Sequence, residues 1–349
     1  MAKRNEDDRE KIDMRFITCA SYHGTGSSAI TRFVSEFENV YSFSEDEFRF
    51  IQDMDGIDDL RYHLIDNHNR HNSGHALKRY KKLVDFYNGG IQGKKYRTYF
   101  GDNWKKFSYE YMEKLTDFTF KGWWFYDLYD RGMLYYIWKR AWPVVLKQTI
   151  WRNADRERDL NTLKNEITYC SRPTEETFIQ LTKEYIEKLF GAVCPQDKIA
   201  MVDQILPPSN ISRYTEYFED IKVVVVERDP RDLWTLQNYV WKDGVFPKDV
   251  ETFCKWYKYT RAHRKDEKYD DTTTKLLQFE DLIYHYEETT QELMEWLCLS
   301  PEQHVQKKMI FSPEASKKNT QVWLQHKVPE EAIRYIEKEL AEYLYNFPE

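Results

Sequence analysis

A run of four valines between two charged residues, Lys222 to Glu227 (KVVVVE), constrains the fold more than any other stretch of the chain. Continuous β-branched runs of this kind are typical of a central strand in a parallel sheet, which is buried on both faces. The polar turn Arg228–Asp232 follows directly, and helical character begins at Leu233. This order of strand, polar loop and helix predicts one unit of a parallel α/β sheet.

The same order occurs near the N-terminus. Residues Met14–Ala20 (MRFITCA) predict a short buried strand. Apolar side chains then recur at the helical spacing i, i+3, i+4 and i+7, at Ile30, Phe33, Val34 and Phe37. Ligands of parallel α/β sheets bind at the carboxyl ends of the strands, and both polar loops lie at such ends.

The composition is that of a globular protein, since the 349 residues are 41% hydrophobic and 32% charged. The net charge of −7 gives no reason to expect a nucleic-acid partner, because binding a phosphate backbone usually needs an excess of Lys and Arg. The five cysteines are scattered and lack CxxC spacing, which disfavours a disulfide framework or a zinc ribbon. The charged leader, residues 1–13, has no apolar signal-peptide core, and no apolar run approaches the roughly 18 residues of a membrane span. We expect a cytoplasmic protein without membrane insertion. The sequence does not specify its oligomeric state.

The rest of the pattern completes the outline of one domain. A further strand is predicted at Thr274–Phe279, a helix at about Glu287–Cys298, and a last helix after Pro329. Residues 60–195 have a weak strand signal and many aromatic side chains, which indicates a largely helical segment. We therefore predict an α/β fold, a parallel sheet flanked by helices, as a single domain over residues 14–349 with a helical, aromatic-rich insertion at 60–195.

The first polar loop, Ser21–Ala29 (SYHGTGSSA), can cradle a phosphate. Its glycines allow close backbone approach, and its hydroxyls and backbone N–H groups lie at a helix N-terminus, where the dipole favours an anion. The candidate phosphate-binding residues are Gly24, Thr25, Gly26, Ser27, Ser28 and Ala29. The loop lacks the GxxxxGK[ST] pattern of nucleotide-binding P-loops, which disfavours an ordinary phosphotransferase. A simple helix-capping turn is the alternative.

Together with this loop, the string VVVVERDPRDLW at residues 223–234 resembles the PAPS-dependent sulfotransferase family. The stretches Lys198–Pro208, Leu276–Leu282 and Ser312–Trp323 are also similar to members of that family. The resemblance implies a P-loop-like fold in which the first loop binds the 5′-phosphosulfate and Arg228 binds the 3′-phosphate. A salt-bridge network within the Arg228–Asp232 turn is the alternative for this arginine.

The chain departs from the family pattern at two places. Gly24 stands where members commonly carry Lys or Arg, so His23 is the nearest candidate cation in the first loop. Leu236 stands where a phosphate-binding Ser is usual, and Thr235 beside it is the candidate contact. The resemblance also implies a late loop that closes over the nucleotide, with Lys317, Lys318 and Asn319 near phosphate and Trp323 on the adenine.

Sulfuryl transfer needs a base at the acceptor oxygen and requires no metal. Residues 40–50 (VYSFSEDEFRF) look like the acidic element of glycan-modifying sulfotransferases, which implies Glu47 as the base. His23 and His63 are the next candidates. His71 and His75 have an i, i+4 spacing that could bind zinc, but their polar surroundings favour a helix end.

The sequence thus predicts transfer of a sulfuryl group from PAPS to a hydroxyl of a carbohydrate, with an acidic glycan as one candidate acceptor. Trp123–Tyr126 could stack on sugar rings, and residues 94–152 carry 12 Lys or Arg against 6 acids. Two alternatives stay open. One is a P-loop-type phosphotransferase, and the other is a catalytically inactive protein that binds PAP or a glycan.

Overall fold

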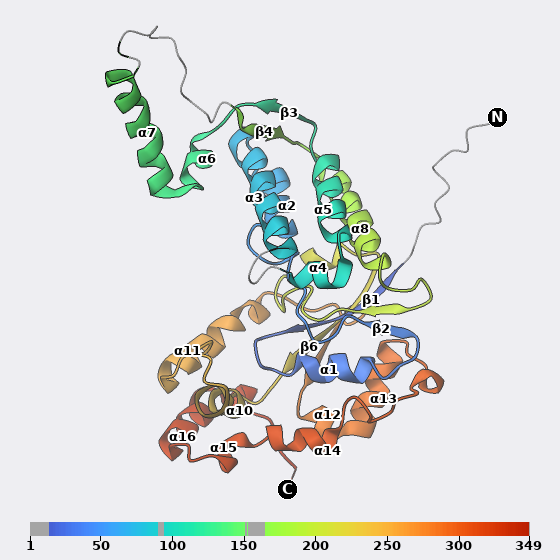
Figure 1. Ribbon diagram of the computed structural model, residues 1–349. Coiled ribbons are helices and arrows are strands. Elements are labelled where there is room, and N and C mark those ends of the chain that lie inside the picture. The colour runs from blue at the N-terminus through green and yellow to red at the C-terminus, as the bar shows by residue number, and fades with distance from the viewer. Residues whose placement is uncertain (1–13, 90–93, 151, 153–164, 349) are drawn as a thin grey trace, which may run out of the picture. The chain divides into compact units, whose positions relative to one another are not determined.

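The computed structural model of the chain describes residues 14–89, 94–150, 152 and 165–348 (Figure 1). The predicted charged leader, residues 1–13, lies outside them. The chain divides into two compact units. We call Met1–Gln52 with Ile186–Glu349 the sheet unit, and Asp53–Tyr185 the helical unit.

The sheet unit is built on five strands in the order β2-β5-β1-β6-β7, and every pairing in this sheet is parallel. The valine run lies in β6, next to the central strand, where all four valines are fully buried. This confirms the predicted α/β fold with a parallel sheet. The strands are β1 (Arg15–Ser21), β2 (Val40–Ser42), β5 (Ile199–Met201), β6 (Asp220–Glu227) and β7 (Thr274–Gln278).

Helices cover both faces of this sheet. Successive side chains of β1 point to opposite faces, so the contacts of two neighbouring residues show what covers each face. Ile17 packs in a cluster with Phe33 of α1 and Leu293 of α13. Phe16, its neighbour, lies edge-on against Phe190 at the end of α8 and against Phe218. A second cluster joins helices α10, α11 and α16, and the last helix with its C-terminal end contributes Ala332, Ile336 and Leu340 to it.

The helices of the sheet unit have the following bounds. They are α1 (Ser27–Val34), α9 (Ile211–Thr215), α10 (Pro230–Thr235), η3 (Leu236–Trp241), α11 (Val250–Thr260), η4 (Ala262–Lys265), α12 (Asp281–Tyr284), α13 (Tyr286–Trp296), η5 (Pro301–Gln303), α14 (Pro313–Ser316), η6 (Lys317–Asn319), α15 (Val322–Gln325), α16 (Glu330–Glu339) and η7 (Ala341–Tyr343).

The helical unit is held together by buried aromatic side chains. The rings of Tyr111 and Tyr185 stack 4.8 Å apart, and Tyr80 lies edge-on to Tyr111. Two of the phenol groups are hydrogen-bonded as well, Tyr185 to Ser108 and Tyr111 to Thr182, each at 2.7 Å. The helices are α2 (Ile57–Arg61), η1 (Tyr62–Asp66), α3 (Arg70–Asn88), α4 (Lys95–Phe100), α5 (Asn103–Lys114), α6 (Phe125–Tyr129), α7 (Gly132–Gln148) and α8 (Glu175–Gly191), which crosses into the sheet unit.

This segment is largely helical and aromatic-rich, as predicted, but it also contains a two-stranded antiparallel sheet of β3 (Phe118–Lys121) and β4 (Ile167–Cys170). All four residues of β3 are exposed, and its alternation Phe118, Thr119, Phe120, Lys121 is only four residues long, which is too short to stand out within an aromatic-rich segment. No helix in the described part of the chain combines the length and apolar character that a membrane crossing needs.

Candidate functional site

The first loop connects β1 to α1 through two glycines with left-handed backbone. Gly24 has φ 75° and Gly26 has φ 107°. A Cβ atom on Gly26 would lie 2.5 Å from Cδ2 of Phe279. Thr25 is buried, and its hydroxyl donates to the Tyr22 carbonyl at 2.7 Å, so this side chain shapes the turn. Gly24, Gly26, Ser27 and Ser28 are partly exposed, which leaves the loop open to a ligand, whereas Ala29 is buried.

We expect Gly26→Ala to lower the free energy of unfolding by about 2–5 kcal/mol, because it adds left-handed strain and a clash with the Phe279 ring. Gly244→Ala is the matched control, since Gly244 also has positive φ but faces open space. That variant should lose only about 1–2 kcal/mol. Urea unfolding of both variants measures the difference, and equal losses would show that the ring moves aside.

Arg228 joins two of the predicted phosphate-binding segments. Its guanidinium donates to the carbonyl of Gly24 at 3.1 Å and to the carbonyl of Asn319 in the late loop. The side chain is buried and lies 4.6 Å from the centre of the Phe279 ring. Its Nε has no hydrogen-bond partner among the described residues. Burial lowers the pKa of Arg228, and an anion at Nε would offset that desolvation. We call the first loop, Arg228 and Lys317–Asn319 the loop site.

The second arginine of the Arg228–Asp232 turn behaves differently. Arg231 pairs with Asp229 at 2.7 Å and with Glu337 at 2.9 Å. The predicted alternative of a salt-bridge network therefore describes Arg231. Arg228 is bonded to backbone carbonyls instead, and is the arginine whose Nε is left without a partner in the described structure.

Two buried carboxyl groups flank Arg228. Burial raises the pKa of Asp232 to about 7, and that of Glu280 to about 8. Asp232 accepts hydrogen bonds from the backbone N–H groups of Gln321 and Val322, so it fixes the end of the late loop. Glu280 accepts from the backbone N–H of Asp229 at 2.9 Å. Both groups gain protons near neutral pH, which reduces the negative charge around the site.

The other residues predicted to bind the nucleotide, from the late loop and α10, differ in their exposure and contacts. Lys318 is exposed, and Lys317 lies 5.6 Å from the Tyr284 ring. Trp323 is covered by the Arg231 guanidinium, 4.2 Å above its ring, so one face of the indole is occupied within the protein. Thr235 is fully buried, and its Oγ1 has no partner among the described residues.

Asp203 connects the segment that carries Glu47 to the first loop. The sequence analysis did not predict a role for this residue. Asp203 follows β5, and it accepts a hydrogen bond from the hydroxyl of Ser27 at 3.2 Å. Its carbonyl accepts from the N–H of Phe48 at 2.9 Å, which anchors the segment that carries Glu47. Glu47 itself is partly exposed and pairs with Arg49 at 3.5 Å. Burial, and then the Glu47 charge, raise the pKa of Asp203 to about 7.

Asp203 should make stability depend on pH. Its folded pKa of about 7 exceeds its ordinary value of 3.8, so the folded state binds more protons than the unfolded state between those values. The free energy of unfolding should therefore fall as pH rises through this window, by on the order of 3–4 kcal/mol from this group. Asp203→Asn keeps an acceptor for Ser27 and should flatten the pH curve measured by urea unfolding. Parallel curves for the two proteins would contradict this assignment.

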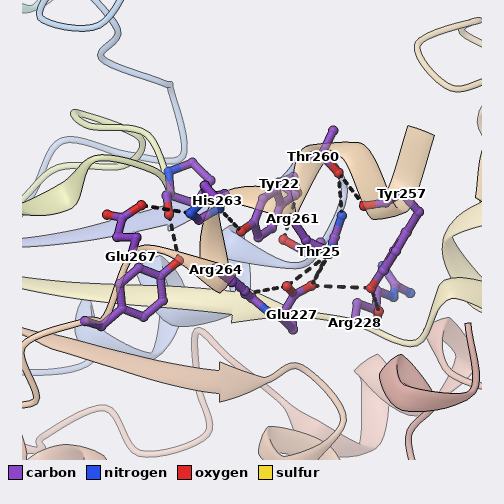
Figure 2. Close-up of polar contacts among 12 residues, drawn as sticks. Tyr22, Thr25, Glu227, Arg228, Tyr257, Thr260, Arg261, His263, Arg264 and Glu267 are labelled. Carbon is purple, nitrogen blue, oxygen red and sulfur yellow. Dashed lines mark hydrogen bonds and ion pairs between the residues drawn. The ribbon is translucent and has the colours of Figure 1, made fainter. Parts of the chain in front are cut away.

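Two hydrogen-bonded clusters lie beside the first loop and were not predicted (Figure 2). In one, the Tyr22 hydroxyl lies 2.7 Å from Nε2 of His263, whose Nδ1 lies 2.8 Å from Glu267. Burial raises the pKa of Tyr22, which keeps its phenol protonated. The chain Tyr22–His263–Glu267 can thus hold the tyrosine in one orientation at the start of the loop.

In the other cluster, Glu227 at the end of β6 pairs with two arginines, Arg261 at 2.7 Å and Arg264 at 2.5 Å. Arg261 is packed between the rings of Tyr22 and Tyr257, at 4.0 and 3.5 Å from their centres. One carboxylate facing two guanidinium groups leaves a local excess of positive charge. Both guanidinium groups lie over the ring of Tyr22, at 4.0 Å for Arg261 and 5.3 Å for Arg264.

The predicted histidines do not gather into one site. His23 is exposed, 3.8 Å from Asp243. In the helical unit, His71 lies edge-on to the Trp124 ring at 3.9 Å, and His75 lies 3.3 Å from Asp130. Burial lowers the pKa of His75. His63 lines a pocket of about 330 Å³ within this unit, together with His75, Arg79 and Asp130. Among the described residues, no group of three or more His, Cys, Asp or Glu side chains could hold a metal ion.

No protein-family model matches the chain, and no curated protein matches it significantly. By structure, it is similar to several solved sulfotransferases. The domain from the curacin biosynthetic pathway is 10% identical, covers 96% of this chain and 99% of its own length, and has a TM-score of 0.40. The domain from the Synechococcus olefin synthase is 12% identical, covers 99% and 100%, and also has a TM-score of 0.40. A Mycobacterium tuberculosis sulfotransferase is 12% identical, covers 88% and 77%, and has a TM-score of 0.33. At such scores, the residues of the loop site rather than these likenesses support a function.

Proposed function

We propose that the chain transfers a sulfuryl group from PAPS to a hydroxyl of a carbohydrate acceptor. The observation that carries this proposal is the position of Arg228, which hydrogen-bonds both the first loop at Gly24 and the late loop at Asn319. These three segments are far apart in the sequence, and each resembles a donor-binding segment of the same enzyme family. Their convergence on one buried guanidinium is what a site for a doubly phosphorylated nucleotide requires.

In this proposal each segment of the loop site binds a different part of PAPS. The backbone of Gly24–Ala29, with the partly exposed Ser27 and Ser28 hydroxyls, holds the 5′-phosphosulfate at the N-terminus of α1. Arg228, with Thr235, holds the 3′-phosphate, and Lys317–Asn319 with Trp323 cover the nucleotide. Trp323 would offer the adenine the ring face that Arg231 leaves uncovered. PAPS supplies the sulfuryl group, and no metal is required.

Glu47 is the proposed base. It takes the proton of the acceptor hydroxyl as the new S–O bond forms and the S–O bond to the 5′-phosphate breaks. The positive charge near the first loop, from Arg261 and Arg264, would stabilise the charge that develops on the leaving phosphate, and the exposed His23 could donate a hydrogen bond to it. Asp203 accepts a hydrogen bond from Ser27 of the first loop, so its carboxyl group lies next to the proposed donor site. A protonated Asp203 would not repel the phosphosulfate there.

Exposed aromatic side chains of the helical unit support a carbohydrate as the acceptor. Trp123–Tyr126 expose four consecutive aromatic side chains, and exposed rings of this kind stack on the apolar faces of sugars. The cytoplasmic location expected from the sequence stays part of this proposal.

The donor can be tested with adenosine 3′,5′-bisphosphate (PAP), ATP and CoA in a thermal-shift series. PAP at about 100 times its Kd should add roughly 2.7 kcal/mol of stability, and ATP should add far less. Equal shifts with ATP would favour a phosphotransferase. A protein that binds PAP but sulfates nothing across a broad glycan panel would be a binding protein.

Arg228→Ala should weaken PAP binding by about 1.5–3 kcal/mol, which is the scale of a hydrogen bond to a charged group. Adenosine 5′-monophosphate is the matched ligand, because it lacks the 3′-phosphate, and its affinity should change little. Calorimetric titration of both nucleotides measures the difference. Equal losses for the two would mean that Arg228 supports the loop and does not contact the 3′-phosphate.

A further inference from the structure

Helix α7 exposes the apolar stripe that a helix of a globular protein normally buries. Leu134, Ile137, Trp138, Ala141 and Val145 recur at the spacing i, i+3, i+4, i+7 and i+11, and all five are exposed. Leu134 is 86% exposed, and Leu146 is the one buried residue among the described residues of the helix. Figure 1 shows α7 (green) standing apart from helices α3, α5 and α8 of the same unit.

The same segment is strongly basic in an acidic protein. Residues 131–152 contain five Lys or Arg and no Asp or Glu, although the whole chain has a net charge of −7. Arg131 pairs with Glu166, but Lys139, Arg140 and Lys147 form no ion pair with any described residue. Lys139 and Arg140 instead lie over tyrosine rings, at 5.4 and 5.3 Å. Within the described part of the chain, no carboxylate neutralises these three cations.

Two tryptophans complete the pattern. Trp138 and Trp142 are one helical turn apart, and their rings stack 4.8 Å from each other at the edge of the apolar stripe. Tryptophan prefers the boundary between water and hydrocarbon, where its ring is buried and its N–H stays solvated. At helical periodicity Lys139, Arg140 and Lys147 fall on the other side of the helix from the apolar stripe. Exposed Leu, Ile, Val and Trp on one side, with Lys and Arg on the other, are the side-chain arrangement of an interfacial membrane helix. We call the apolar stripe, Trp142 and the three cations Lys139, Arg140 and Lys147 the α7 surface.

We propose that the α7 surface docks on a bilayer of anionic phospholipids, with the helix lying in the plane of the interface. The cations match anionic headgroups, and the aliphatic side chains would enter the region between headgroups and hydrocarbon. An acidic glycan would match the same cations, but it would leave Leu134, Ile137 and Val145 in water. This docking goes beyond the sulfuryl transfer proposed above and does not depend on it.

Vesicle sedimentation with the full chain tests the proposal. The protein should pellet with vesicles that contain about 30% phosphatidylglycerol, and much less with pure phosphatidylcholine. The partition coefficient should fall on the order of tenfold or more when salt is raised from about 0.05 to 0.5 M, because screening weakens attraction to the headgroups. The absence of sedimentation with anionic vesicles at low salt would overturn the proposal.

Two variants separate the apolar and the charged contributions. Arg140→Gln with Lys147→Gln should lower the partition coefficient by about tenfold to thirtyfold. Leu134→Ser with Ile137→Ser and Val145→Ser should lower it by at least about tenfold while keeping every charge. Val305→Ser with Met309→Ser, which changes exposed apolar residues of the sheet unit, is the matched control and should bind vesicles like the wild type. An unchanged far-ultraviolet circular dichroism spectrum and melting temperature, compared with the parent chain, check that each variant folds.

Two other occupants would give different results, and each would overturn the proposal. If heparin-like polyanions compete fully with the vesicles and the triple serine variant binds like wild type, the surface recognises acidic glycans. If the chain is a dimer by light scattering, does not bind vesicles, and becomes monomeric in the triple serine variant, the surface is a protein interface.

Discussion

Glu47→Gln should lower kcat for sulfuryl transfer by about 10²–10⁴-fold and leave the affinity for PAP nearly unchanged. The glutamine keeps the shape of the side chain but cannot accept the proton of the acceptor hydroxyl. Steady-state rates and PAP titrations on the same preparation measure both quantities. Glu45→Gln is the matched control, because Glu45 is a near neighbour whose carboxylate pairs with Arg32 at 2.5 Å and has no proposed chemical role.

The Glu47 variant also has a readout that does not need the acceptor. The Glu47 charge helps to raise the pKa of Asp203, so its removal should lower that pKa from its value of about 7. The pH dependence of the unfolding free energy should shift to lower pH accordingly. If turnover survives while this shift is seen, the base lies elsewhere, and His23 and His63 are the next residues to test.

Glu227→Ala should lower the free energy of unfolding by about 3–5 kcal/mol, because it leaves Arg261 and Arg264 without their shared carboxylate in a buried setting. Urea unfolding with a shared m-value measures the loss. Glu330→Ala is the control for an exposed pair, since Glu330 and Arg334 are both largely exposed, and it should lose less than about 0.5 kcal/mol. A loss below about 1 kcal/mol for Glu227→Ala would show that water replaces the carboxylate.

The same variant connects the cluster to the proposed function. Arg261 packs on the Tyr22 ring, at the start of the first loop, so loss of its partner should disturb that loop. We expect PAP binding by Glu227→Ala to weaken along with stability. Tyr22→Phe keeps the ring and removes the hydroxyl that bonds His263, and comparing the two variants tells whether the ring or its hydroxyl positions the loop.

Patterns local in the sequence predicted the framework of the protein well. The valine run predicted a buried parallel strand, and the glycine and serine turn predicted a strand-to-helix loop, because both depend on neighbouring residues alone. The predicted last helix begins at Glu330, directly after Pro329. The exposed strand β3 was not predicted, since its apolar and polar side chains alternate over only four residues in a segment rich in aromatic side chains.

The sequence by itself determined the parallel sheet and the chemistry available at its carboxyl ends, because residue type and spacing decide both. Only the tertiary structure decided which distant groups meet. Tyr22 and His263 are 241 positions apart, and no local pattern links them. Burial raises the pKa of Asp203, and burial is a property of the packed chain. The stripe of α7 reads as a core helix by periodicity, and only the fold shows that it faces outward, since the same spacing fits either environment.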